Sequence, residues 1–97
     1  MFARLTNFHI DVKMFKKGAN MYEKSVVPAA RLQKGYKGAM LLGNPKTGEG
    51  VSITFWESEK DAEANEQNQY YQNQLVKFIT AFTNPPTRQG FEVLLNE

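Results

Sequence analysis

The amino-acid sequence predicts an α+β fold in which four antiparallel strands and two helices follow one another in the order βαββαβ. Three observations lead to this prediction. Four segments have the apolar content or the two-residue alternation of strands, two segments carry apolar residues at helical spacing, and turn-forming residues separate them. The chain of 97 residues has the length of one domain, so we expect residues 1–97 to form a single unit.

The first strand is predicted over Ala3–Val12, because polar and apolar residues alternate there in the run NFHIDV. A strand with this pattern is half buried, with one face toward the core. The segment Lys13–Gly18 marks its end. The three lysines in this segment are expected to belong to a solvated turn, and the alternative is a site for phosphate or another anion.

The first helix is predicted over Ala19–Lys34. Tyr22, Val26 and Ala30 recur there every four residues and form a short apolar stripe along one side of the helix. Pro28 lies within this stretch. Since proline removes one helical hydrogen bond and crowds the preceding turn, we expect a kink or a short break at this residue.

A β-hairpin is predicted next. Its first strand covers Tyr36–Asn44, with a centre, AMLL, that is apolar on both faces and must therefore be covered on both sides. The turn formers PKTGEG follow. The second strand, VSITFW, then alternates between two different faces up to Trp56.

The second helix is predicted over Glu59–Phe82. Ser58 is its expected N-cap residue, with Asp61 three residues later in the pattern of a capping box. The polar run EANEQNQYYQNQ in its first half is interpreted as the solvated start of a helix. An aromatic stripe follows and includes Tyr71 and Phe78. After two prolines, the last strand is predicted over Phe91–Leu95.

This order of elements is the ferredoxin-like arrangement, in which both helices cover one face of a four-stranded antiparallel sheet. The other face is left bare. Leu5, Met40 or Leu41, and Leu94 are expected on it and would form a larger exposed apolar patch than a soluble monomer usually has. We therefore expect a homodimer in which two sheets meet through this open face in a symmetric contact.

The composition limits location and partners. The formal net charge of +2 does not indicate a nucleic-acid partner, and no apolar run is long enough to span a membrane. The N-terminal residues lack the layout of a signal peptide, and there is no cysteine. These features predict a soluble, cytoplasmic protein without nucleic-acid or membrane partners.

Short motifs along nearly the whole chain carry a family resemblance. They are AxLT on the first strand, VxPA in the first helix, GYKGAMLL and SITFWES on the hairpin, and YY followed by LxKF in the second helix. With them the chain resembles the antibiotic biosynthesis monooxygenase family. The resemblance implies a dimeric α/β barrel and includes cofactor-independent oxygenases, haem-degrading enzymes and small proteins without an assigned activity.

No cofactor or metal is expected. In the haem-degrading branch of the family, a histidine of the second helical region holds the iron, together with an asparagine on the first strand. The predicted second helix contains no histidine, and His9 is the only one in the chain. No spaced set of metal ligands and no phosphate-binding glycine loop is present either.

Three residues are candidates for catalysis if the chain is an oxygenase. The resemblance implies that an electron-rich phenol or enol is deprotonated and that its anion reduces dioxygen in a dry aromatic pocket. His9 is the candidate base, Asn7 could donate to an oxyanion, and Trp56 could stack on a ring or polarise a carbonyl. Their alternative roles are structural. A cavity on the helix side of the sheet would exclude both Asn7 and His9, because their parity places them on the opposite face.

Tyr36, Tyr71 and Phe78 are candidates for lining a substrate pocket, with a place in the core as the alternative. The favoured function is cofactor-independent oxidation of a small planar aromatic or enolic metabolite by a monooxygenase. The alternative is a dimeric protein of the same fold that binds a small hydrophobic molecule without transforming it, or that serves a stress-related role. The sequence alone leaves open whether the protein is an enzyme.

Overall fold

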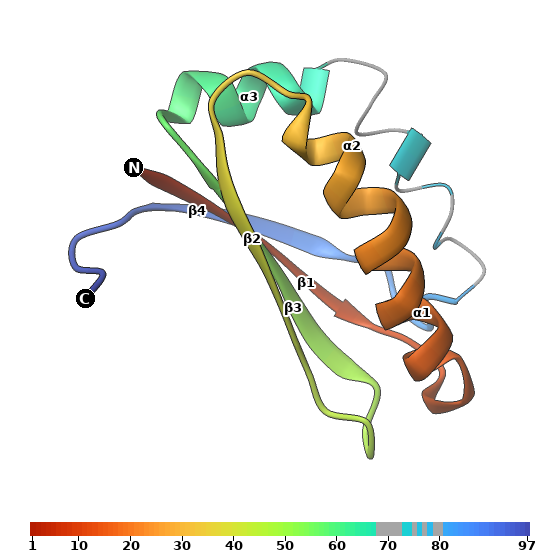
Figure 1. Ribbon diagram of the computed structural model, residues 1–97. Helices are drawn as coiled ribbons and strands as arrows, with labels where there is room; N and C mark the ends of the chain where they lie inside the picture. The colour runs from red at the N-terminus through yellow and green to blue at the C-terminus, as the bar shows by residue number, and fades with distance from the viewer. Residues whose placement is uncertain (68–72, 75, 77, 79–80) are drawn as a thin grey trace.

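The computed structural model describes residues 1–67, 73–74, 76, 78 and 81–97. A four-stranded antiparallel sheet has the strand order β2-β3-β1-β4, and all the labelled helices lie on one of its faces (Figure 1). The predicted α+β, ferredoxin-like fold is confirmed. The strands are β1 Phe2–His9, β2 Tyr36–Gly43, β3 Glu49–Trp56 and β4 Thr87–Glu92. The helical elements are the 3-10 turn η1 Val12–Met14, α1 Phe15–Met21, the π turn η2 Tyr22–Val26, α2 Val27–Arg31 and α3 Glu59–Gln67.

The strand register assigns each side chain to one face of the sheet. Leu5 pairs with Ile53 of β3 and with Gln89 of β4, and Ile53 pairs in turn with Met40 of β2. Directly paired residues lie on the same face, and neighbours along a strand lie on opposite faces. The odd-numbered residues of β1 and β3 therefore form the open face, and the even-numbered residues form the face under the helices.

The first strand is shorter than predicted, because it ends at His9 rather than Val12. Ile10 makes only an isolated bridge to Phe82. The carboxylate of Asp11 then accepts a hydrogen bond from the backbone N–H of Lys13 at 2.9 Å and begins the 3-10 turn η1. A short side chain that bonds to the backbone in this way favours a turn over a continuing strand, although the alternating pattern runs on through Val12.

The first helical region begins earlier than predicted, at η1 and α1, and its last helix ends at Arg31. The predicted stripe of Tyr22, Val26 and Ala30 is buried. The expected irregularity at Pro28 is a π turn just before it, in which the N–H of Val27 bonds to the carbonyl of Tyr22, five residues back. The wider turn keeps the proline ring clear of the preceding carbonyl groups and places Pro28 at the start of α2, where no N–H is required.

The predicted second helix is confirmed at its start and wrong at its end. The N–H of Asp61 donates to the hydroxyl of Ser58 at 3.2 Å, as expected for an N-cap, and α3 covers Glu59–Gln67. The helix does not continue to Phe82. Phe78 lies in a turn, and Phe82 bridges to Ile10 beside the end of β1.

The last strand lies four residues earlier than predicted, over Thr87–Glu92 instead of Phe91–Leu95. The apolar run FEVLL suggested the later position, but β4 is an edge strand whose first half, TRQG, is polar. Polar edge strands are common in soluble proteins because they do not invite further pairing. Leu94 and Leu95 lie beyond the strand and are 94% and 79% exposed.

A small hydrophobic core lies where α3 crosses the sheet. Phe2, Trp56 and Ala62 form it, and all three are at most 4% exposed. Tyr36 packs against this group, with its ring edge-to-face to the indole of Trp56 at 6.0 Å between centroids. This core fixes one end of the sheet under α3 and leaves the middle of the sheet to a cavity.

The open face is strongly apolar. Met40, Leu42 and Phe91 are each about half exposed on it, although they lie in regular strands. Leu5 and Ile53 lie between them on the two central strands. Several large apolar side chains exposed on one face of a sheet are unusual on a protein that remains a monomer.

No helix in the described part of the chain is both long enough and apolar enough to cross a membrane.

We predict that Ser58→Ala will destabilise the protein by about 1 kcal/mol, because it removes the side-chain acceptor at the start of α3. Urea unfolding monitored by circular dichroism measures this loss. Ser58→Asp is the matched control, since aspartate also caps helices and should retain most of the stability. Equal stability of the alanine and aspartate variants would show that the cap contributes nothing.

Candidate functional site

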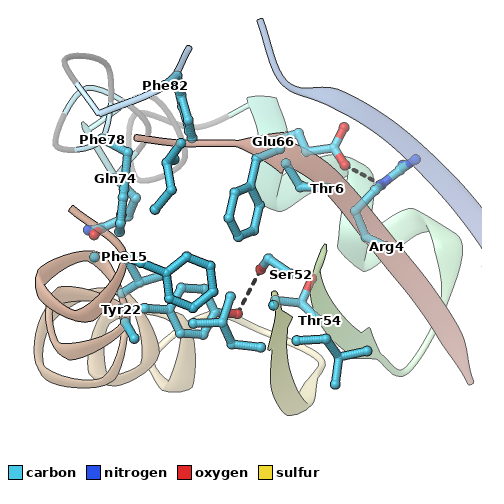
Figure 2. Close-up of a pocket in the computed structure, with 18 of the residues that line it drawn as sticks. Arg4, Thr6, Phe15, Tyr22, Ser52, Thr54, Glu66, Gln74, Phe78 and Phe82 are labelled. Atoms are coloured by element: carbon cyan, nitrogen blue, oxygen red, sulfur yellow. Dashed lines mark hydrogen bonds and ion pairs between the residues drawn. The ribbon is translucent and has the colours of Figure 1, made fainter. Parts of the chain in front are cut away.

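A cavity of about 240 Å³ lies between the sheet and the helices (Figure 2). Its floor consists of even-numbered residues of the two central strands, including Thr6, Ser52 and Thr54. The helical region supplies Phe15 and Tyr22 on one side. The cavity therefore lies on the helix side of the sheet, away from the open face.

Five aromatic residues help to line the cavity. They are Tyr22 and four phenylalanines, namely Phe8, Phe15, Phe78 and Phe82. The rings of Phe78 and Phe82 stack at 6.3 Å between centroids, and Phe82 also contacts Phe8 at 6.4 Å. A planar, apolar ligand would find rings on more than one side of it.

Two paired glycines make room for these rings. Gly43 and Gly50 face each other across β2 and β3. A Cβ atom on Gly43 would lie 2.3 Å from the ring of Phe15, and one on Gly50 would lie 2.3 Å from the ring of Phe8. Because no larger residue allows such a close approach, the two glycines determine where both rings stand at this end of the cavity.

Hydroxyl groups form one polar part of the cavity lining. The phenol of Tyr22 and the hydroxyl of Ser52 are hydrogen-bonded at 2.8 Å, as Figure 2 shows. Burial raises the pKa of Tyr22, and the nearby Tyr36 adds to this effect, while the hydrogen bond with Ser52 lowers it. The phenol therefore keeps its proton at neutral pH and can act as a donor.

The hydroxyl of Thr54 can act as a second hydrogen-bond donor in the cavity. The indole N–H of Trp56 donates to the Thr54 hydroxyl oxygen at 2.9 Å. Since the hydroxyl accepts this bond, its own hydrogen is available for another acceptor, and hydrogen bonds in such a chain strengthen one another. Trp56 thus acts on the cavity through Thr54 and does not itself line it.

An ionic cluster closes the cavity on the side of α3. The carboxylate of Glu66 forms an ion pair with Arg4, which lines the cavity floor, and a second with Arg88 of β4 at 3.1 Å. The guanidinium of Arg4 also lies 5.4 Å from the ring centroid of Phe2. Both carboxylate oxygens of Glu66 are thus paired with guanidinium groups.

The structure separates His9 and Asn7 from this cavity. Both lie on the open face of β1, and neither lines the cavity. Nδ1 of His9 and the hydroxyl of Thr83 are hydrogen-bonded to each other, and the N–H of Thr83 donates to the His9 carbonyl at 2.8 Å. Asn7 donates to Gln89 at 2.9 Å. Their contacts fasten the end of β1 to neighbouring segments. Because the cavity lies on the helix side of the sheet, neither residue can take part in chemistry inside it, as the parity of β1 predicted.

The other predicted site residues lie in different parts of the molecule. Trp56, at 1% exposed, and Tyr36 belong to the core at the end of the sheet. Phe78 lines the cavity. Tyr71 lies outside the described residues. The predicted residues are therefore not brought together in one site, and Phe78 is the one that the structure places at this cavity.

Sequence reasoning missed the hydroxyl cluster of Tyr22, Ser52 and Thr54. The signal was present in the alternation of β3, where Ser52 and Thr54 share one face and Val51, Ile53 and Phe55 share the other. Polar residues on a strand usually face solvent, so only the position of the helices reveals that these two point into a cavity. Among the described residues, no group of histidine, cysteine or acidic side chains is gathered in a way that could hold a metal ion.

The fold is similar to that of solved monooxygenases. A monooxygenase from Streptomyces coelicolor, ActVA-Orf6, solved in complex with the ligand nanaomycin D, matches with a TM-score of 0.76 at 17% sequence identity, over 99% of this chain and 92% of that one. A crystal structure of an antibiotic biosynthesis monooxygenase matches with a TM-score of 0.77 at 12% identity, over 98% of this chain and 100% of the other.

Rv0793 from Mycobacterium tuberculosis matches with a TM-score of 0.75 at 16% identity, over 98% of this chain and 96% of its own. No sequence model of a known family and no curated protein matches the chain. At these identities the likeness concerns the fold. The predicted resemblance to the antibiotic biosynthesis monooxygenases is therefore confirmed as a shared fold that extends over nearly the whole chain.

Proposed function

We propose that the cavity binds a small planar aromatic or enolic metabolite and that the protein is a cofactor-independent monooxygenase acting on it. The observation that carries this proposal is the cavity itself, which is lined by five aromatic residues and contains the partly buried hydroxyl pair of Tyr22 and Ser52. The shared fold with solved monooxygenases supports the reaction type.

The proposed reaction needs no reductant besides the substrate. In an anthrone, the methylene group between two aromatic rings becomes a carbonyl group. One atom of dioxygen enters the product, and the other leaves as water with both methylene hydrogens. The substrate supplies all the electrons, after loss of a proton has made it an electron-rich enolate.

The residues of the cavity have three tasks in this reaction. The phenylalanine rings hold the planar substrate and exclude water from it. The hydroxyls of Tyr22, Ser52 and Thr54 can donate to the substrate oxygen on which negative charge develops. Because both carboxylate oxygens of Glu66 are engaged in ion pairs, the proposal favours substrates that are themselves acidic, such as phenols and enols.

The alternative function is binding without chemical transformation. One observation favours it: among the described residues that line the cavity there is no histidine, and the carboxylate of Glu66 is ion-paired. A protein of this kind would hold a small hydrophobic molecule in the same cavity. Both functions thus share one ligand class and differ in whether oxygen is consumed.

The proposal includes a homodimer built through the open face. Met40, Leu42 and Phe91 expose about half of their surface there, and burying them against a second copy would remove this apolar area from water. A symmetric contact between two identical sheets meets the requirement without any other partner. We also infer a cytoplasmic location, which the absence of cysteine favours, and no nucleic-acid or membrane partner.

We predict that the protein sediments as a dimer at low micromolar concentration and that Met40→Glu shifts it to a monomer. The substitution places a charge on the face proposed for the contact, where it would be desolvated without a partner. Leu32→Glu is the matched control, since Leu32 is 84% exposed at the end of α2 on the helix side and should leave the dimer intact. A monomeric unmodified chain would contradict the proposal.

We predict oxygen uptake when the protein is offered a panel of anthrones and hydroquinones, and a loss of turnover of roughly tenfold or more in Tyr22→Phe. The variant keeps the ring and removes the donor, so kcat should fall more than KM rises. Tyr36→Phe is the matched control, because Tyr36 packs on Trp56 outside the cavity.

His9→Ala distinguishes the cavity from the open face as the place of reaction. We expect unchanged turnover, because His9 lies on the opposite side of the sheet and is bonded to Thr83. A strong loss of turnover with an intact dimer would instead identify His9 as the base. If no compound on the panel raises oxygen uptake above background while ligands still bind, the non-catalytic function is favoured.

A further inference from the structure

Among the described residues that line the cavity, one buried polar atom has neither a hydrogen-bond partner nor an ion-pair partner. Asn65 lies on α3, three residues after the fully buried Ala62, and thus on the side of the helix that faces the sheet. It is 9% exposed and is one of the residues that line the cavity. Its side-chain oxygen, Oδ1, is buried and meets no hydrogen-bond donor within the described part of the chain.

Several other polar side chains that line the cavity are already engaged. Tyr22 and Ser52 bond to each other, Glu66 pairs with Arg4, and Thr54 accepts from the indole of Trp56. Folded proteins satisfy the great majority of their buried polar groups, because an unpaired one costs free energy. The exception therefore requires an explanation, and its position in the cavity points to a bound molecule.

We infer that Asn65 accepts a hydrogen bond from a hydroxyl or N–H group of the ligand and so determines which aromatic molecules the cavity takes. The inference rests on the proposed function in one respect, which is that the cavity binds an aromatic or enolic ligand. A carbonyl oxygen can accept from a neutral phenol, an enol or an aromatic amine. An ether or a ketone has no hydrogen to give and would leave Oδ1 unpaired.

The same argument concerns the charge of the ligand. A deprotonated phenolate oxygen placed against Oδ1 would bring two acceptors together without a hydrogen between them. The group that meets Asn65 therefore keeps its proton in the complex. A developing negative charge on the substrate is accommodated at another oxygen, toward the hydroxyls of Tyr22 and Thr54.

The test compares two probes that differ by one hydrogen-bond donor, 1-naphthol and its methyl ether, 1-methoxynaphthalene. Calorimetric titration of the unmodified protein should show at least about tenfold tighter binding of the naphthol, since a factor of ten corresponds to about 1.4 kcal/mol. Sites that hydrogen-bond a ligand hydroxyl discriminate against analogues that lack it. Equal affinity for the two probes would overturn the inference while leaving aromatic binding, and so the proposed function, in place.

Replacing Asn65 tests whether its side chain causes the preference for the naphthol over the ether. Asn65→Leu retains a side chain of similar size without the acceptor, and it should bind the naphthol and the ether with equal affinity. Asn20→Leu is the matched control, because Asn20 is an exposed residue of α1 outside the cavity and its replacement should keep the preference. A preference that survives in Asn65→Leu would overturn the role of Asn65. Binding of neither probe by the unmodified protein would remove the proposed function together with this inference.

Discussion

The polarity of the sheet is the constraint on which the rest of the molecule depends. In the middle of the central strands, the face under the helices carries Thr6, Ser52 and Thr54, whereas the open face carries Leu5 and Ile53. A protein with one sheet face in water usually has the opposite arrangement, with apolar residues under the helices. The sheet and helices of one chain therefore do not fully satisfy the side chains on either face. The inner face requires hydrogen-bond partners, and the outer face requires apolar cover.

The inner face meets this requirement partly through the irregular first helical region. The π turn before Pro28 is a wide turn that precedes α2, and Tyr22 is its first residue. From there the phenol reaches Ser52 on β3. In a regular helix Pro28 would be disruptive. Here it is accommodated in the same helical region that supplies the phenol of Tyr22 to the cavity.

The cavity also has a cost in stability. Within the described part of the chain, few large hydrophobic side chains are fully buried, and the cluster of Phe2, Trp56 and Ala62 lies at one end of the sheet and not at its middle. Filling the cavity with apolar side chains would add buried surface and would remove the unpaired oxygen of Asn65. The chain retains instead a hollow lined with rings and hydroxyls. This exchange of packing for space is typical of sites that bind a ligand.

Local features of the fold could be read from the sequence because they are decided by neighbours along the chain. The hairpin, the cap at Ser58, the buried stripe that includes Tyr22 and the irregularity at Pro28 all depend on residues within a few positions of one another. The position of β4 was predicted wrongly for the complementary reason. Its place is set by pairing with β1, so the polar residues of TRQG join the sheet while the more apolar Leu94 and Leu95 remain outside it.

The sequence by itself therefore determined the order of the elements, the fold and the presence of two unlike faces on β3. The tertiary structure alone decided which of those faces lies under the helices. That choice places Ser52 and Thr54 in the cavity, and His9 outside it. It also buries Asn65, although the run EANEQNQ suggested a solvated helix. The physical reason is that alternation assigns a residue to a face, whereas only the packing of distant segments determines what that face meets.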